Sequence, residues 1–91
     1  MITDYIPTGK ANAVTRSQLC AQTGLDDRKV RELIEAARHN GELIINNGSG
    51  YFIADIDTDR AEIAKQRNTI VRRVRAQLHY LKFYGEALGG G

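Results

Sequence analysis

The chain has 91 residues, of which 42% are hydrophobic and 26% charged, and its formal net charge is +2. This length fits one small domain with a single core, and no stretch approaches the roughly 18 apolar residues of a membrane span. The single cysteine, Cys20, excludes a disulfide within the chain, and the N-terminus lacks the pattern of a signal peptide, so we expect a cytoplasmic protein.

The N-terminal elements are short. We expect a turn of helix over residues 2–6, halted at Pro7, then a loop over residues 8–12 and a brief extended segment at residues 13–14. Proline and glycine punctuate this stretch, which favours turns over long elements.

The first regular helix is expected from about Arg16 to Thr23. Thr15 is a good N-cap and Gln18, three residues later, completes a capping box. Gly24 is typical of the left-handed residue that ends a helix. The apolar face of this helix is expected to consist of Leu19, Cys20 and Ala21.

A second helix is expected from Asp26, its N-cap, to about Asn40, with Gly41 at its C-terminal end. The spacing i, i+3, i+4, i+7 predicts one buried stripe, formed by Val30, Leu33, Ile34 and Ala37.

The period then changes to that of strands. Residues 43–45 and 51–53 are β-type runs, and residues 46–50 between them are rich in asparagine and glycine. This pattern predicts a β-hairpin.

A long last helix is expected from about Asp59 to Tyr84, begun by Asp57 or Thr58. Its length is roughly 39 Å at 1.5 Å per residue. Its apolar side is formed by Ile63, Ile70, Val71, Val74, Leu78, Leu81 and Phe83 or Tyr84. The chain therefore divides into a domain of residues 1–56, a basic amphipathic helix of residues 57–85 and a flexible tail of residues 86–91.

The element order indicates a mainly α fold with a small β-hairpin (α+β), arranged as a winged helix-turn-helix with an added C-terminal helix. Three segments, PTGKANAVTR from Pro7, GLDDRKVR from Gly24 and GYFI from Gly50, resemble small winged-helix proteins of Gram-positive prophages. The resemblance covers about residues 2–85. It implies this fold and DNA binding. From the helix-turn-helix layout we expect sequence-specific binding of double-stranded DNA by a transcriptional regulator or an accessory recombination factor of the excision type.

In a helix-turn-helix, the first residues of the second helix reach base edges in the major groove. Here these residues are Arg28, Lys29, Arg31 and Glu32. Arginine can bind guanine with two hydrogen bonds and glutamate can accept one from cytosine. The alternative is a solvated face with Arg28–Glu32 and Arg31–Glu35 pairs, or a face that binds a protein partner, in which Glu32 and Glu35 are exposed at its centre.

Further DNA contacts are expected from two polar clusters. The start of the first helix can hold a phosphate through Thr15, Arg16 and Ser17, and the tip of the hairpin can touch the DNA backbone through Asn46, Asn47 and Ser49. The simpler alternatives are that Thr15 only caps its helix and that Asn-Gly only forms the hairpin turn.

The last helix concentrates positive charge. Residues 60–82 hold seven basic side chains and one acidic one. Phosphate contacts are possible from Arg67, Arg72, Arg73 and Arg75, and a homodimer interface is expected at Ile70, Val74, Leu78 and Leu81. The alternatives are an exposed basic face or a helix at a membrane surface; the clustering of Tyr80, Phe83 and Tyr84 at one end favours packing instead.

Nothing in the sequence predicts an enzyme, a cofactor, a metal site or a small-molecule ligand. Thr8-Gly9-Lys10 lacks the upstream glycine of a phosphate-binding loop. Cys20 lies on an apolar face, where a buried and inert thiol is expected rather than a nucleophile paired with His39 or His79. One cysteine and two distant histidines do not make a zinc site.

Overall fold

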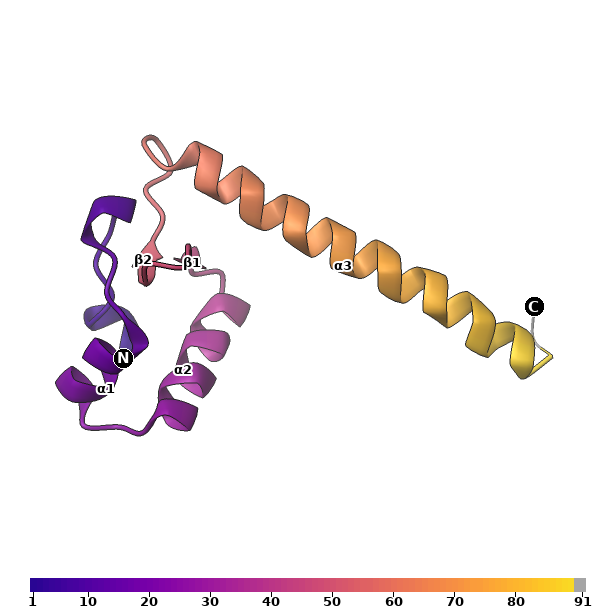
Figure 1. Ribbon diagram of the computed structural model, residues 1–91, viewed down its shortest axis with the longest axis horizontal. Coiled ribbons are helices and arrows are strands. Elements are labelled where there is room, and N and C mark those ends of the chain that lie inside the picture. Colours follow the sequence, from indigo (N-terminus) through magenta and orange to yellow (C-terminus); the bar gives the residue numbers. More distant parts are fainter. Residues whose placement is uncertain (90–91) are drawn as a thin grey trace.

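The computed structural model describes residues 1–89 (Figure 1). Two short 3-10 turns, η1 (Ile2–Asp4) and η2 (Lys10–Asn12), open the chain. They are followed by α1 (Arg16–Thr23), α2 (Asp27–His39), β1 (Ile44–Asn46), β2 (Tyr51–Ile53) and α3 (Arg60–Ala87). The architecture is mainly helical with one two-stranded antiparallel sheet, which confirms the α+β class. Residues 8–12 were expected to form a loop, but the last three of them form the single 3-10 turn η2.

The ends of α1 and the start of α2 are fixed by local hydrogen bonds. Thr15 Oγ1 accepts from the backbone N–H of Gln18 at 3.1 Å, and Gln18 Oε1 accepts from the N–H of Thr15 at 2.8 Å, so the capping box is confirmed. Gly24 ends α1 with φ of +72°. Asp26 Oδ1 accepts from the N–H of Lys29 at 2.8 Å and caps α2.

The main core lies between α1, α2 and the sheet. The stripe of α2 is buried at Val30, Ile34 and Ala37, with Leu33 half-buried beside it. These side chains pack with Ile2, Ile6, Leu19, Ile44 and Tyr51. A two-turn helix reaches this core through one fully buried side chain, Leu19.

Two neighbours of Leu19 were expected to share its apolar face. Cys20 is half-buried against the core, whereas Ala21 is exposed and that prediction is wrong. The reason is geometric, because Ala21 follows Leu19 by two positions and therefore points about 200° away around the helix.

The sheet pairs Ile44 with Ile53, Ile45 with Phe52, and Asn46 with Tyr51. The first strand is shifted by one residue from the expected run 43–45, and Leu43 before it is exposed. Ile45 and Phe52 form a second small core with Ala54.

The expected extended segment at residues 13–14 also joins the sheet. The N–H of Val14 donates to Tyr51 O at 2.9 Å, and the N–H of Tyr51 donates to Val14 O at 2.6 Å. The hairpin is therefore tied on one side to the chain that leads into α1.

The chain turns tightly before α3. Asp55 Oδ1 accepts from the N–H groups of Asp57 at 2.8 Å and Thr58 at 3.1 Å, and Asp59 Oδ2 accepts from the N–H of Asp55 at 2.9 Å. Asp59 occupies the N-cap position without a side-chain cap bond. The prediction that Asp57 or Thr58 caps the helix is wrong, because Asp55 uses their N–H groups to build the preceding turn.

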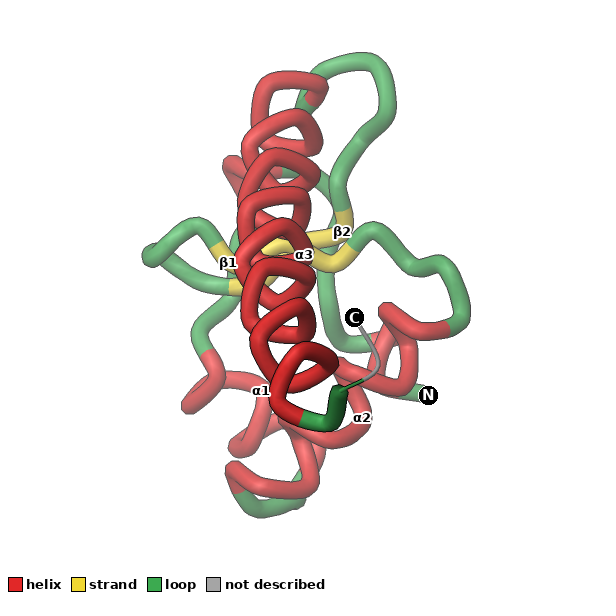
Figure 2. The backbone as a smooth tube through the Cα atoms, turned by 90° about the vertical axis from the view of Figure 1, so that its right-hand side faces the viewer, coloured by secondary structure: helices red, strands yellow, loops and turns green. Residues whose placement is uncertain are grey.

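Helix α3 leaves the compact part of the molecule and extends into solvent (Figures 1 and 2). None of its residues is buried, and Ile63 alone packs on the second core. The expected packing residues Tyr80, Phe83 and Tyr84 are exposed, since the small domain ends before the helix reaches them.

The far end of α3 lies at Ala87, three residues beyond the expected Tyr84, so Glu86 and Ala87 of the expected tail are helical. Gly90 and Gly91 of that tail lie outside the described residues. Among residues 1–89, no helix combines the length and the apolar character needed to cross a membrane.

Candidate nucleic-acid interface

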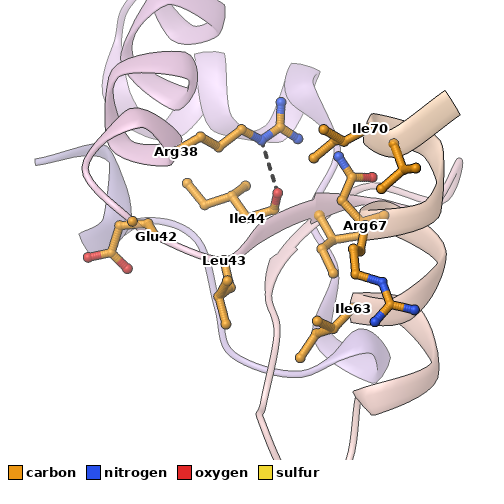
Figure 3. A pocket seen from close by; sticks show the side chains of 11 residues that line it. Arg38, Glu42, Leu43, Ile44, Ile63, Arg67 and Ile70 are labelled. Atoms are coloured by element: carbon orange, nitrogen blue, oxygen red, sulfur yellow. Dashed lines mark hydrogen bonds between the residues drawn. The ribbon is translucent and has the colours of Figure 1, made fainter. Parts of the chain in front are cut away.

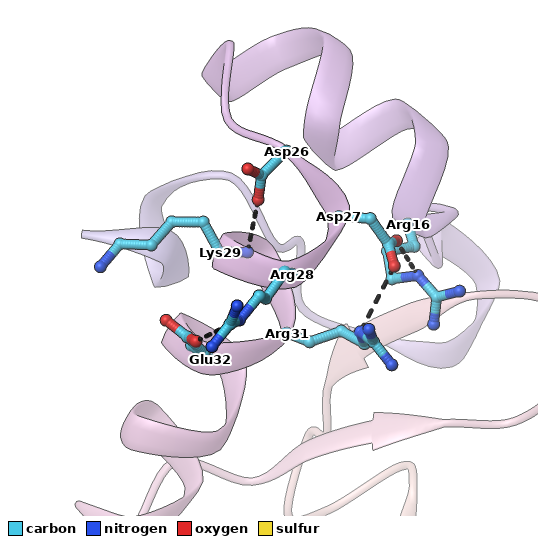
Figure 4. A network of polar contacts seen from close by, with 7 residues as sticks. All are labelled: Arg16, Asp26, Asp27, Arg28, Lys29, Arg31 and Glu32. Carbon is cyan, nitrogen blue, oxygen red and sulfur yellow. Dashed lines mark hydrogen bonds and ion pairs between the residues drawn. The ribbon is translucent and has the colours of Figure 1, made fainter.

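The first turns of α2 point three basic side chains into solvent (Figure 4). Arg28 is the most exposed of the ion-paired residues there, with 85% of its side chain accessible, and its Nε lies 3.2 Å from Glu32 Oε1. Lys29 extends on another side of the helix and forms no ion pair within residues 1–89. The expected Arg28–Glu32 pair is confirmed.

Arg31 belongs to a network that joins the starts of two helices. Asp27 binds Arg16 through Oδ1 and Arg31 through Oδ2, the latter at 3.3 Å from Arg31 Nε. The predicted Arg31–Glu35 pair is wrong, because Arg31 turns back one helical turn toward the carboxylate that Arg16 already approaches. Glu35 instead lies 3.6 Å from Arg38 Nη1.

Arg16 also connects this network to the sheet. Hydrogen bonding with the Tyr51 hydroxyl, and then with the Asp27 carboxylate, raises the pKa of the Arg16 guanidinium above its ordinary value. The Arg16 side chain thus lies beside Tyr51 of β2 as well as Asp27 of α2. The sequence patterns did not assign Asp27 and Tyr51 to the site. Tyr51 belongs to the predicted strand of residues 51–53 and Asp27 follows the predicted N-cap Asp26, and neither pattern reveals a contact across the fold.

The other two residues expected to bind DNA at the start of α1, Thr15 and Ser17, differ in whether their hydroxyl groups are free to bind another molecule. Thr15 uses its hydroxyl oxygen for the capping bond, so its role as a cap is confirmed. Ser17 is exposed and makes no side-chain hydrogen bond within the described part of the chain. Both Arg16 and Ser17 are exposed, and Arg16 lies at the first turn of α2 through its ion pair with Asp27.

At the hairpin tip, both asparagines stabilise the turn through their carbonyl oxygens. Asn46 Oδ1 accepts from the N–H of Gly48 and Asn47 Oδ1 from the N–H of Ser49, each at 3.0 Å. Their side-chain NH2 groups make no hydrogen bond within residues 1–89. The turn therefore leaves the NH2 groups of the exposed Asn46 and the half-exposed Asn47 unused within the described residues.

The four arginines predicted to track phosphate do not share one face of α3. Arg73 lines a groove of about 750 Å³ together with Glu32, Glu35 and His39 of α2. Arg72 lies about 100° and Arg75 about 200° away from Arg73 around the helix. The structure thus brings Arg73 to the exposed side of α2 and leaves Arg72 and Arg75 elsewhere. Arg67 lines a different groove, between α3 and β1.

The surface over α2 is of mixed charge. Glu32 and Glu35 keep 53% and 77% of their side chains exposed, and each is paired with an arginine of the same helix. The basic side chains therefore do not form one unbroken positive patch. Arg28, Lys29 and Arg31 surround these acids on the N-terminal half of α2.

Within residues 1–89, no group of three His, Cys, Asp or Glu side chains is arranged to hold a metal ion. Cys20 packs against the main core, far in sequence from both histidines.

Comparison with known proteins adds no assignment. The chain matches no family model, and neither curated proteins nor solved structures give a match. We therefore infer the function from the residues and geometry of this chain.

Proposed function

We propose that the chain is a winged helix-turn-helix protein that binds double-stranded DNA, with the N-terminal half of α2 in the major groove. The observation that carries this proposal is the exposure of Arg28, Lys29 and Arg31 on the first turns of the second of two packed helices. The first residues of this helix are those that reach base edges in helix-turn-helix proteins.

The surrounding elements support the same placement. Helix α1 packs against α2, and the hairpin follows α2 directly and is bridged by Val14, an order that suits a wing. The start of α1 offers Arg16 and Ser17 to a phosphate beside α2. A prophage-type transcriptional regulator or accessory recombination factor is the role that we propose for such a module.

A second candidate function is a protein-interaction module on the same scaffold. It is favoured by the exposure of Glu32 and Glu35 at the centre of the α2 surface. These acids would repel phosphates unless they stay paired with their arginines.

Binding to random-sequence duplex DNA, measured by fluorescence anisotropy at about 50 and 200 mM salt, tests the proposal. Several phosphate contacts predict micromolar affinity that falls by orders of magnitude over this salt range. Absence of binding at low salt would reject DNA binding and direct the search to protein partners.

A matched pair of variants then tests the role of α2. With a selected target site, Arg28→Ala should weaken specific binding by about 1–3 kcal/mol if Arg28 reads a base. Arg60→Ala removes the same charge at the exposed start of α3 and should change affinity less. Equal losses in the two variants would remove the base-reading role from Arg28.

A further inference from the structure

Beyond its first two turns, α3 exposes a continuous apolar stripe, here called the α3 stripe. Seen along the helix axis, its members fall within one side at the 100° spacing of a helix. The stripe consists of Ile70, Val71, Val74, Leu78, Leu81, Gly85 and Leu88, and all except Gly85 are large apolar side chains that are at least 38% exposed. Contiguous exposed apolar surface is typical of a site that another molecule covers.

A groove at the base of α3 continues this stripe toward the compact part of the molecule. It has a volume of about 370 Å³ and lies between the segment from Gly41 to Ile45 and the α3 residues Ile63, Arg67, Ile70 and Val71. Leu43 borders it on one side and Ile63 and Ile70 on the other (Figure 3). The groove and the α3 stripe thus form one apolar surface that a helix can follow.

We propose that two copies of the chain pair through the α3 stripe in antiparallel orientation, so that the C-terminal end of each α3 fills the groove of the other copy. This pairing does not rest on DNA binding, because it uses a surface that the DNA-binding residues of α2 do not form. In this pair, the α3 stripe of each copy is covered by the α3 helix of the other copy.

The distribution of charge along α3 selects the antiparallel orientation. Residues 60–75 hold six basic and one acidic side chain, a net charge of +5, whereas residues 76–88 hold one of each sign and are neutral. A parallel pair places the two +5 halves beside one another, and like charges at that spacing repel. An antiparallel pair places each +5 half beside a neutral half and also opposes the two helix dipoles.

The spacing of the stripe fits the same orientation. With a two-fold axis near Ala76, Val74 of one copy lies opposite Leu78 of the other, and Val71 lies opposite Leu81. Both pairs alternate in steps of three and four residues, as packed helices require. The same register places Gly85, the position without a side chain, opposite Arg67, the charged residue in the base of the groove.

The register places the C-terminal part of each α3 opposite the groove of the other copy. Residues 81–86 of the second copy fall opposite residues 66–71, a span that includes four of the α3 residues that line the groove, Gln66, Arg67, Ile70 and Val71. The side chain of Leu81, 64% exposed in a single copy, lies opposite Val71 and would enter it. Each apolar end of α3 thereby meets the apolar base of the other.

Sedimentation equilibrium of the full chain at micromolar concentration tests the pairing. The wild-type chain should be a dimer, Leu78→Glu should be a monomer, and Ala76→Glu, which adds the same charge on the opposite face, should remain a dimer. Circular dichroism checks that both variants keep their helices. A monomeric wild-type chain at 100 µM, on the order of the concentrations at which weak pairs form, would overturn the proposal, as would a dimeric Leu78→Glu.

Spin labels test the orientation separately. In a Cys20→Ser background, Arg75→Cys and Glu86→Cys each provide one labelling site. The antiparallel register separates the two labels at position 86 by about 30 Å along the axis and those at position 75 by about 3 Å, at 1.5 Å per residue. Pulsed dipolar spectroscopy should therefore report a long distance for position 86 and a short one for position 75. Short distances at both positions would show a parallel pair and reject the antiparallel arrangement.

Discussion

The compact part of the molecule, residues 1–59, and helix α3 use apolar side chains in opposite ways. All eleven buried hydrophobic residues of the described chain lie in the compact part, whereas nine of its fourteen exposed large hydrophobic residues lie between Ile70 and Leu88. The compact part therefore buries its apolar side chains in its own core, whereas the apolar side chains of α3 from Ile70 onward are exposed in a single copy.

This difference indicates where the stability of a single copy resides. Burial of apolar surface is the main favourable term in folding, and only the compact part gains it. Helix stability in proteins comes mostly from packing of an amphipathic face rather than from propensity. The outer half of α3 therefore gains little stability from packing within one copy. This is the physical reason to expect a partner there.

The largest expected contrast is between one side chain from each region. Phe52 is fully buried, so Phe52→Ala should lower the free energy of unfolding by about 3–5 kcal/mol. Leu78 is exposed, and Leu78→Ala should change that free energy by less than about 0.5 kcal/mol in a dilute, monomeric sample. Urea denaturation measures both. A comparable loss in Leu78→Ala at high dilution would show that α3 packs within its own copy.

A second contrast lies inside the compact part, at two glycines of the hairpin. Gly50 has φ of +150°, and a Cβ there would lie 2.5 Å from Val14 O, whereas Gly48 has φ of +90° and open space around it. Gly50→Ala should cost roughly 1–3 kcal/mol from the overlap, in addition to the strain of a positive φ. Gly48→Ala should cost only that strain, about 1–2 kcal/mol.

Thermal unfolding distinguishes these two variants. In a domain of this size, each kcal/mol shifts Tm by about 4–8 °C. The Tm of Gly50→Ala should therefore lie below that of Gly48→Ala. The reverse order would mean that the pairing between Val14 and Tyr51 contributes little to the compact part.

A smaller effect is expected at the cap of α1. Thr15→Ala removes the acceptor for the N–H of Gln18 and should cost about 1 kcal/mol. Ser17→Ala removes a hydroxyl two residues away that makes no such bond, and its stability should lie within about 0.5 kcal/mol of the wild type. Urea midpoints compare the two, and equal values would indicate that water replaces the capping bond.

The limits of α1 and α2 were predictable because their determinants are local. Thr15, Gly24 and Asp26 act on backbone groups within four residues, so the sequence contains the full interaction. The start of α3 was placed less well, since four acidic or hydroxyl residues compete there and Asp55 takes the N–H groups of Asp57 and Thr58.

The contacts within the candidate site and the exposure of α3 could not be predicted from local sequence patterns, because both depend on how distant elements pack. The partners of Asp27 come from α1 and α2 at once, and Arg16 also meets Tyr51 from β2. The period of the α3 stripe shows which side of the helix is apolar, but not whether the domain is large enough to cover it. The structure answers the second question, because the described chain buries no residue of α3.

The junction between the two regions gives the smallest expected effect, a dependence on pH. Lys10 Nζ lies 3.0 Å from Glu62 Oε1 and so ties η2 to the start of α3. The hydrogen bond from Lys10, together with the positive charges of Lys10 and Lys65, holds the pKa of Glu62 below its ordinary value of 4.5. The N–H groups of Thr58 and Asp57 likewise hold the pKa of Asp55 below 3.8.

A pKa that is lower in the folded state means that the unfolded chain binds the proton more tightly. The stabilisation by Glu62 is therefore complete above about pH 4.5 and is lost as the pH falls through its lower, folded value. Urea midpoints measured from pH 6 to pH 3 should decline in this range for the wild type. Glu62→Gln should start from a lower midpoint at pH 6 and decline less, retaining only the contribution of Asp55 and other carboxylates. Parallel curves would show that Lys10 and Glu62 do not connect α3 to the compact part in solution, and the two regions would then be joined by the Asp55 turn and the packing of Ile63 alone.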